Sequence, residues 1–175
     1  MNILEDLAID LNTNLVGTVD DVFDCGNCSQ SLQFFSSEKV DLTGSFPDRI
    51  GDFTRLTFLR IRASLISGTI PSSLGLLTRL SVLDLSVNYN FADPNPLPTE
   101  LGMLTQMKEF SVSNSIVTDQ LPTEFGNMRV LEKLHIDLTW MEGAIPLTMC
   151  QIPSLKEIKH PVDVDCGCSG SVCEL

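Results

Sequence analysis

The chain has 175 residues, of which 23 are acidic and 11 are basic, so its formal net charge at pH 7 is −12. Nucleic acids and anionic membrane surfaces bind proteins that present basic surfaces, so this balance argues against both as partners. The sequence also contains no run of about 18 apolar residues, the length that a transmembrane helix needs.

The N-terminal part of the chain is acidic and only weakly patterned. Residues 1–8 contain acidic side chains and no basic segment, so they do not form a secretory signal peptide. Residues 6–35 carry a degraded copy of an apolar pattern that becomes regular further along. We therefore expect a degenerate first repeat here, and a solenoid that continues upstream if the sequence belongs to a longer protein.

A Cys-x-x-Cys pair interrupts this first repeat. Cys25 and Cys28 could form a redox site, but no thioredoxin-like βαβ pattern precedes them, so we expect a local disulfide. Asn27 opens Asn27-Cys28-Ser29, the one N-x-Ser/Thr sequon in the chain, and is a glycosylation candidate in a secreted protein.

From residue 35 onward the chain repeats with a fixed period. The apolar residue that opens each unit recurs in steps of 24, 24, 27, 24 and 24, and the proline that closes it in steps of 24, 27, 24 and 24. The apolar markers are Phe35, Leu59, Leu83, Phe110, Leu134 and Ile158, and the prolines are Pro47, Pro71, Pro98, Pro122 and Pro146. Such a short unit cannot bury its own apolar face, so the units must stack on one another.

Each unit predicts three short elements, most clearly in the copy that starts at residue 59. Residues 59–61 alternate apolar and polar side chains, as in a half-buried strand. Residues 68–71 are extended, because proline fixes φ and biases the preceding residue away from helix. Residues 72–80 predict a short helical or 3₁₀ turn on the opposite side, broken by glycine.

The third unit and the turn that follows each strand depart from this regularity. Phe91–Pro98 holds three extra residues and three prolines, which predicts a stiff loop instead of a strand. The side-chain amide of a buried asparagine satisfies more backbone groups in a turn than a hydroxyl does. Only one of the turn positions holds an asparagine, so we expect an incomplete ladder of asparagines along the stacked turns. The turn residues are Ser64, Asn88, Ser115 and Thr139.

These units resemble the plant-type leucine-rich repeat, L-x-x-L-x-L-x-x-N-x-L-x-G-x-I-P-x-x-L-G-x-L-x. The matching stretches are residues 59–80 and their copies, including 97–102 and 121–126. The resemblance covers residues 32–160 well and 6–31 weakly. It implies an α/β repeat solenoid, a right-handed arc with a concave parallel β-sheet and with 3₁₀ or short helical turns on the convex side.

The C-terminal residues look like the Cys-rich cap of secreted repeats of this type, which are found in plants and microalgae. We expect a single domain over residues 1–175. It comprises the degenerate repeat at 6–35, regular repeats of 24–27 residues at 36–155 and the Cys-rich cap at 156–175.

Four cysteines in the tail allow either zinc or disulfides. The spacing Cys-x-Cys-x₄-Cys matches no common zinc module even with His160 nearby, so we expect two disulfides and no metal. Six cysteines clustered toward the two ends also favour an oxidising compartment. Among the three pairings open to Cys150, Cys166, Cys168 and Cys173, we favour Cys150–Cys166 with Cys168–Cys173.

Two rows of side chains are candidates for binding a partner. On each strand, the residues between the buried ones face the concave side. These concave candidates are Arg60, Arg62, Asp84, Glu109, Ser111, Lys133, His135, Asp137 and Lys159.

A second row of candidates lies one residue after the turn position and forms an apolar flank that includes the only Trp and the only Tyr: Leu65, Tyr89, Ile116 and Trp140. Aromatic residues are enriched at interface hot spots, but partial burial against the next coil is the alternative for this row.

No catalytic or cofactor-binding motif is present: the sequence lacks G-x-S-x-G, the P-loop, G-x-G-x-x-G and H-E-x-x-H. We therefore expect no enzyme activity and no cofactor. The resemblance implies a recognition module of a secreted or cell-surface protein, with a protein, peptide or glycan ligand. The alternative is a structural or scaffold subunit of a larger assembly, for example in an organelle lumen.

Overall fold

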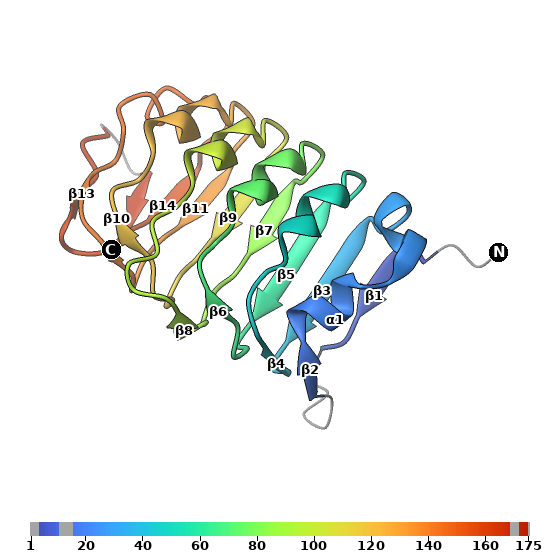
Figure 1. Cartoon of the computed structure of the whole chain (residues 1–175). Coiled ribbons are helices and arrows are strands. Elements are labelled where there is room, and N and C mark those ends of the chain that lie inside the picture. Colours follow the sequence, from blue (N-terminus) through green and yellow to red (C-terminus); the bar gives the residue numbers. More distant parts are fainter. Residues whose placement is uncertain (1–3, 11–15, 169–171, 175) are drawn as a thin grey trace.

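The computed structural model describes residues 4–10, 16–168 and 172–174 of the chain. One sheet of eight parallel strands runs the length of a curved solenoid (Figure 1). In spatial order its strands are β1 (Asp6–Ala8), β3 (Phe34–Glu38), β5 (Phe58–Arg62), β7 (Val82–Asp84), β9 (Glu109–Ser111), β11 (Lys133–His135), β14 (Glu157–Lys159) and β16 (Cys173–Glu174).

The register of this sheet follows the sequence period. The opening apolar residue of each coil pairs with its counterpart in the next coil, as in Leu59 with Leu83 and Leu83 with Phe110. These residues are at most 1% exposed and form the centre of one continuous core. The predicted repeat solenoid with a parallel sheet is therefore confirmed, including its single 27-residue step.

Short strands line the flank of the solenoid, between the concave sheet and the convex turns (Figure 1). They pair as β2 (Val16–Thr18) with β4 (Asp41–Thr43), β6 (Ser67–Gly68) with β8 (Asn90–Phe91), β10 (Thr118–Asp119) with β12 (Trp140–Met141), and β13 (Gly143–Ala144) with β15 (Val164–Asp165). The segment Phe91–Pro98, predicted as a loop, instead begins within strand β8. Phe91 is buried in the core and extends the strand, whereas Asp93 and Pro94 are exposed and belong to the loop.

Short helices line the convex side. The 3₁₀ helices are η1 (Gly26–Gln30), η2 (Asp48–Asp52), η3 (Ser72–Leu76), η4 (Thr99–Met103) and η5 (Thr123–Asn127). The degenerate first coil has, in addition to η1, an α-helix, α1 (Val19–Phe23), which starts at a capping box between Thr18 and Asp21. Phe23 of α1 packs against Phe35 and Phe53, with ring centroids 5.2 and 5.0 Å apart. Within the described ranges, none of the helices has the length and apolar character needed to cross a membrane.

Buried amides join neighbouring coils where the chain leaves the concave sheet. Asn88 is fully buried, accepts a 3.0 Å hydrogen bond from Ser64 N and donates to the Ile61 and Leu85 carbonyls. One coil later, Ser115 Oγ accepts from Asn88 N and donates to Leu85 O, so a hydroxyl replaces part of the ladder.

The three-residue insertion brings in a second buried amide, which the sequence pattern did not indicate. Asn95 accepts a 3.0 Å hydrogen bond from Ile70 N and donates to Ile116 O across two coils. Thr118 Oγ1 accepts from Asn95 N at 2.9 Å. Asn95 therefore satisfies backbone groups that the longer loop would otherwise leave unpaired.

The convex helices η3, η4 and η5 pack so closely that one position in η3 and one in η4 accept only glycine. A Cβ atom on Gly102 would lie 2.5 Å from the Cβ and carbonyl oxygen of Glu124, and a Cβ on Gly75 would meet the Glu100 backbone in the same way. Real Cβ atoms do not approach backbone this closely, so a larger residue would push adjacent coils apart.

We expect Gly102→Ala to destabilise the chain by about 1–3 kcal/mol, the usual cost of overpacking a tight contact. Urea denaturation followed by circular dichroism measures this change. Gly17→Ala is the matched control, since nothing lies within 4 Å of a Cβ atom at Gly17. Equal stability of the two variants would contradict the close packing of η4 against η5.

Candidate binding surfaces

The concave sheet forms one open groove of about 460 Å³. All nine concave residues predicted from the strand alternation line this groove, because the parallel register places equivalent positions of successive strands side by side. Along its central row lie Arg60, Asp84, Ser111, His135 and Lys159.

Ion pairs between neighbouring strands organise most of the charge in the groove. Arg60 Nε lies 3.3 Å from Asp84 Oδ2, and Lys133 Nζ lies 2.8 Å from Glu109 Oε1. The hydrogen bond from Lys133 to Glu109 raises the pKa of Lys133 above its ordinary value. The Arg60 guanidinium also lies over the Phe58 ring, 5.0 Å from its centroid.

At the other end of the groove, Glu157 is shared by two cations. Lys159 Nζ and His135 Nε2 lie 3.0 and 3.1 Å from Glu157 Oε1. The hydrogen bond from Lys159 lowers the pKa of Glu157, and the His135 imidazole adds to this effect when it is protonated.

A row of hydroxyl groups connects the two ends. Ser86 Oγ and Ser111 Oγ are 2.6 Å apart, and Ser113 Oγ donates a 2.5 Å hydrogen bond to Asp137 Oδ1. Ser111, Ser113 and Asp137 are half-buried, so they can exchange their hydrogen bonds for bonds to a ligand, whereas Ser86 is buried. Arg62, beside this row, forms no ion pair with any described carboxylate.

The groove differs in charge from the rest of the chain. With Glu157 included, four basic and four acidic side chains lie in it, so the groove is close to neutral on a chain whose total is −12. The groove is therefore the part of this acidic molecule best suited to an anionic group of a ligand.

The predicted apolar flank row is largely exposed. Leu65, Tyr89 and Trp140 are 45%, 55% and 63% exposed, whereas Ile116 packs partly against the core. Tyr89 Oη accepts a 2.5 Å hydrogen bond from Asn114 Nδ2 of the next coil. Sequence reasoning missed Leu138, which is 70% exposed and lies at the border between this flank and the groove.

The tail contains two disulfides, but the favoured pairing is wrong. Cys150 bonds to Cys168, not to Cys166, and Cys166 bonds to Cys173. The cause is a tight turn at Gly167, whose φ of +56° is readily adopted by glycine, closed by a hydrogen bond from Cys168 N to Cys166 O. The turn directs Cys168 toward Cys150 of the preceding coil, and Cys166 bonds instead to Cys173 of strand β16.

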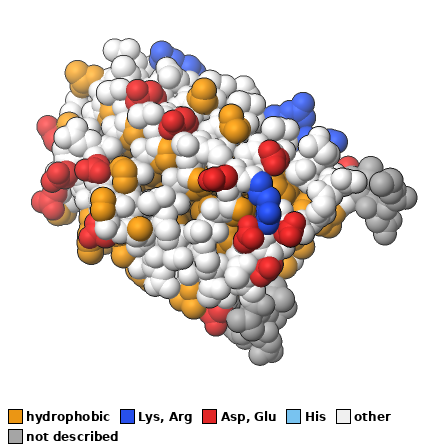
Figure 2. Space-filling model, in the orientation of Figure 1, with side chains coloured by type: hydrophobic (Ala, Val, Ile, Leu, Met, Phe, Trp, Pro, Cys, Tyr) orange, Lys and Arg blue, Asp and Glu red, His pale blue; other side chains and the backbone are white. Residues whose placement is uncertain are grey.

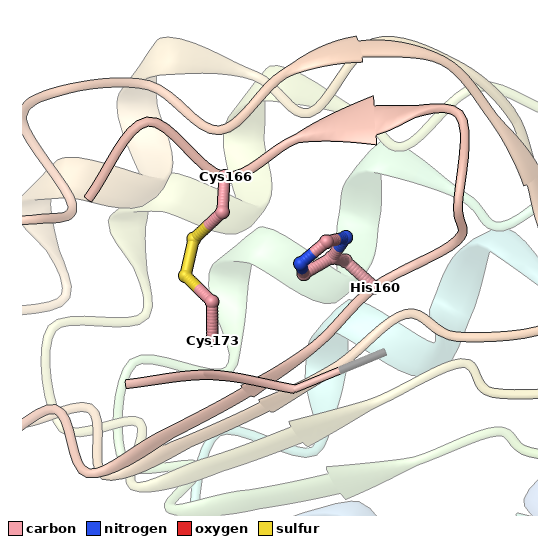
Figure 3. A group of neighbouring side chains, drawn as sticks. All are labelled: His160, Cys166 and Cys173. Atoms are coloured by element: carbon pink, nitrogen blue, oxygen red, sulfur yellow. A yellow bond between two sulfur atoms is a disulfide. The ribbon is translucent and has the colours of Figure 1, made fainter. Parts of the chain in front are cut away.

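His160 lies beside the second of these disulfides (Figure 3). Its Nδ1 is 2.8 Å from the Pro161 carbonyl oxygen, which can only accept, so Nδ1 carries the proton. The three side chains have metal-ligand spacing, but the Cys166 and Cys173 sulfurs are bonded to each other, so His160 alone offers a free ligand atom.

At the other end of the chain, the predicted local disulfide between Cys25 and Cys28 is present. Asn27 lies between them in η1 with an exposed side chain, so the glycosylation candidate is accessible. Occupancy of Asn27 by a glycan stays a prediction.

No protein-family model matches the chain. Receptor-like protein 41 of Arabidopsis thaliana is 30% identical over 146 residues, which are 69% of this chain and 16% of the relative. Receptor-like protein kinase HAIKU2 of Arabidopsis thaliana is 35% identical over 123 residues, 70% of this chain and 12% of the relative. The chain thus spans less than a fifth of the length of these relatives.

Among solved structures, the chain is similar to the leucine-rich-repeat ectodomain of the membrane receptor kinase GASSHO1/SCHENGEN3 from Arabidopsis thaliana, in complex with CASPARIAN STRIP INTEGRITY FACTOR 2. The TM-score is 0.81 at 28% identity, over 90% of this chain and 18% of that one. The chain is a leucine-rich-repeat domain. Its repeats are of the plant extracellular type, similar to those of plant receptor-like proteins and receptor kinases.

We predict that the two tail disulfides survive independently of each other. Cys150→Ser/Cys168→Ser should retain no free thiol in denaturant, because Cys166–Cys173 and Cys25–Cys28 both persist. Thiol titration of the purified, non-reduced protein measures this. Two free thiols in that variant, and none in Cys150→Ser/Cys166→Ser, would instead support the pairing expected from the sequence.

We predict a pKa for Glu157 below its ordinary range, measured by carboxyl-detected NMR titration. Because the folded pKa is depressed, the Glu157 contacts stabilise the fold above the unfolded pKa and are lost as pH falls through the folded value. Lys159→Met should raise the Glu157 pKa toward its usual range. The matched control is Lys156→Met, which should raise the pKa of Glu132, the partner of Lys156, and leave Glu157 unchanged.

Proposed function

We propose that this chain is a non-catalytic recognition domain of a receptor-like or secreted protein, and that it binds an extended segment of a protein or peptide in the concave groove. The observation that carries this proposal is the groove itself, a single open surface shared by five strands and lined by exchangeable polar groups. Solenoids characteristically use such concave surfaces for binding.

The chemistry of the groove suits a peptide. The half-buried Ser111 and Ser113 can donate to and accept from the amide groups of an extended backbone. Arg62 supplies a cation without an ion-pair partner among the described residues, available for an acidic group of the ligand. A groove of this volume falls in the range of ordinary ligand sites.

A recognition role also fits the chemistry that is missing from the described part of the chain. There, no serine or cysteine side chain hydrogen-bonds to a histidine: His135 faces Glu157, and His160 donates to a carbonyl. A histidine in such a pair is a common base for activating a serine or cysteine nucleophile. If the chain were instead a scaffold subunit, substitutions of the groove residues would not change its binding to any partner.

The comparisons and the disulfides support an extracellular setting. The GASSHO1/SCHENGEN3 ectodomain, 28% identical to this chain, was solved in complex with another protein factor. Three disulfides within one domain are typical of proteins that fold in an oxidising compartment.

The test uses a displayed library of random 12-residue peptides, selected on the intact chain. We expect Arg62→Ala to weaken the selected peptides by about tenfold or more, the usual cost of losing a charge-assisted hydrogen bond. Arg79→Ala is the matched control, since Arg79 is exposed in the convex loop after η3. Hydrogen exchange should show protection of β7, β9 and β11 on binding. Peptides that bind both variants equally and protect none of these strands would refute a ligand site in the groove.

A further inference from the structure

A column of left-handed residues borders the groove, one for each of five successive coils. Their φ angles lie between 51° and 63°. Each of them lies one to three residues after the end of a concave strand. The column comprises Lys39, Ala63, Val87, Asn114 and Leu138. The first four donate their backbone N–H to a carbonyl of the next coil, as Val87 N does to Ser113 O at 2.9 Å. The left-handed conformation is therefore imposed by the stacking of coils and not by the residue type.

Two members of this column are poorly suited to that conformation. Asn adopts the left-handed region comparatively easily, whereas a bulky or β-branched residue there is a genuine outlier. Val87 has φ of 63° and Leu138 has φ of 55°. Strained residues of this kind persist where the surrounding structure forces them, and they cluster at functional sites.

The same two residues are part of an apolar band on the molecular surface. We define the edge band as Val87, Tyr89, Leu138 and Trp140, two residues from each of two coils. Leu138, Trp140 and Tyr89 are 70%, 63% and 55% exposed, whereas Val87 is half-buried. Asn114, on the coil between the two halves of the band, donates a hydrogen bond to Tyr89 Oη in one half. Left-handed backbone and exposed apolar side chains thus occur on the same surface. The stacking of coils accounts for the backbone conformation, but core packing does not account for the exposed apolar side chains.

The flank beside this band carries acidic but no basic side chains, and only its segment 64–71 has no charged residue. The flank segments 40–47, 64–71, 88–98, 114–122, 138–146 and 161–165 contain no Lys, Arg or His. Their carboxylates are all exposed, and within the described residues none of them forms an ion pair: Asp41, Asp93, Asp119, Glu142, Asp163 and Asp165. Figure 2 shows acidic and hydrophobic side chains lying side by side at the C-terminal end of this face.

We propose that the edge band docks a segment of a partner protein whose apolar side chains are flanked by lysine or arginine. Apolar contact would be made with Leu138, Tyr89 and Trp140, and the basic residues would face the flank carboxylates. A second copy of this chain is disfavoured as the occupant, because it would bring a like-charged flank against this one. The proposal deepens the recognition role proposed above and rests on it, but it uses residues other than Arg62.

The experiment compares two displayed libraries of random 12-residue peptides on the intact chain. Lys and Arg are the only charged residues in one library, and Asp and Glu in the other. We expect edge-band binders from the basic library, and we expect Val87→Asn/Leu138→Asn to weaken them at least tenfold. The same variant should melt about 2–4 °C higher, because asparagine relieves the left-handed strain.

Val87 and Leu138 also line the groove, so Trp140→Ser and Arg62→Ala are the variants that separate this proposal from the groove. Leu76→Asn/Met103→Asn removes two exposed apolar residues, 57% and 56% exposed, from the convex side and should not affect these peptides. Arg62→Ala should also leave the edge-band peptides bound, whereas it weakens the binding of the groove ligands.

Trp140 is the only tryptophan, so its fluorescence should change when a peptide binds to the wild-type chain. Trp140→Ser provides a second loss-of-binding variant.

Several outcomes overturn the proposal while leaving the groove function intact. These are binders drawn equally from the acidic library, no binder from either library, or binders unaffected by Val87→Asn/Leu138→Asn and Trp140→Ser. Sedimentation that finds a dimer of the wild-type chain, lost in the edge variants, would identify a second copy as the occupant and overturn it as well. Loss of binding only in Arg62→Ala would assign all recognition to the groove.

Discussion

Every coil of this chain depends on the next one for both its core and its backbone hydrogen bonds. The apolar residues of a single coil face only two neighbours, and a coil alone could not exclude water from them. The same stacking dictates the glycines of the convex helices, the buried amides of Asn88 and Asn95, and the left-handed turn after each concave strand. The surfaces available for binding are what this stacking leaves exposed.

The two candidate surfaces differ in how they arise from the stack. In the groove, successive strands bring opposite charges into register, so pairs such as Lys133–Glu109 neutralise one another and the surface is close to neutral. On the flank, the short strands carry only acidic charge, and no basic neighbour within the described residues compensates it. One molecule therefore presents a mixed polar groove and an acidic, apolar edge next to each other.

The sequence was sufficient to predict the solenoid and the membership of the groove, since both follow from periodicity. A strand alternates its side chains strictly, so assigning Leu59 to the core places Arg60 on the concave side. The disulfide pairing was not predictable, because it depends on a turn at Gly167 that reverses the directions of two cysteines. Leu138 was missed for a similar reason: its exposure results from a backbone conformation that leucine does not favour and that the adjacent coil imposes.

The three-residue insertion of the third coil has a consequence for how such a chain can vary. Val82–Asp84 pairs in register with Glu109–Ser111 although the intervening coil is longer, because the extra residues are accommodated on the flank around Asn95. Length changes on the flank are therefore decoupled from the positions of the concave side chains. A lineage could remodel the edge of the solenoid by small insertions while keeping an inherited ligand groove intact, and a protein engineer could graft loops at the same point.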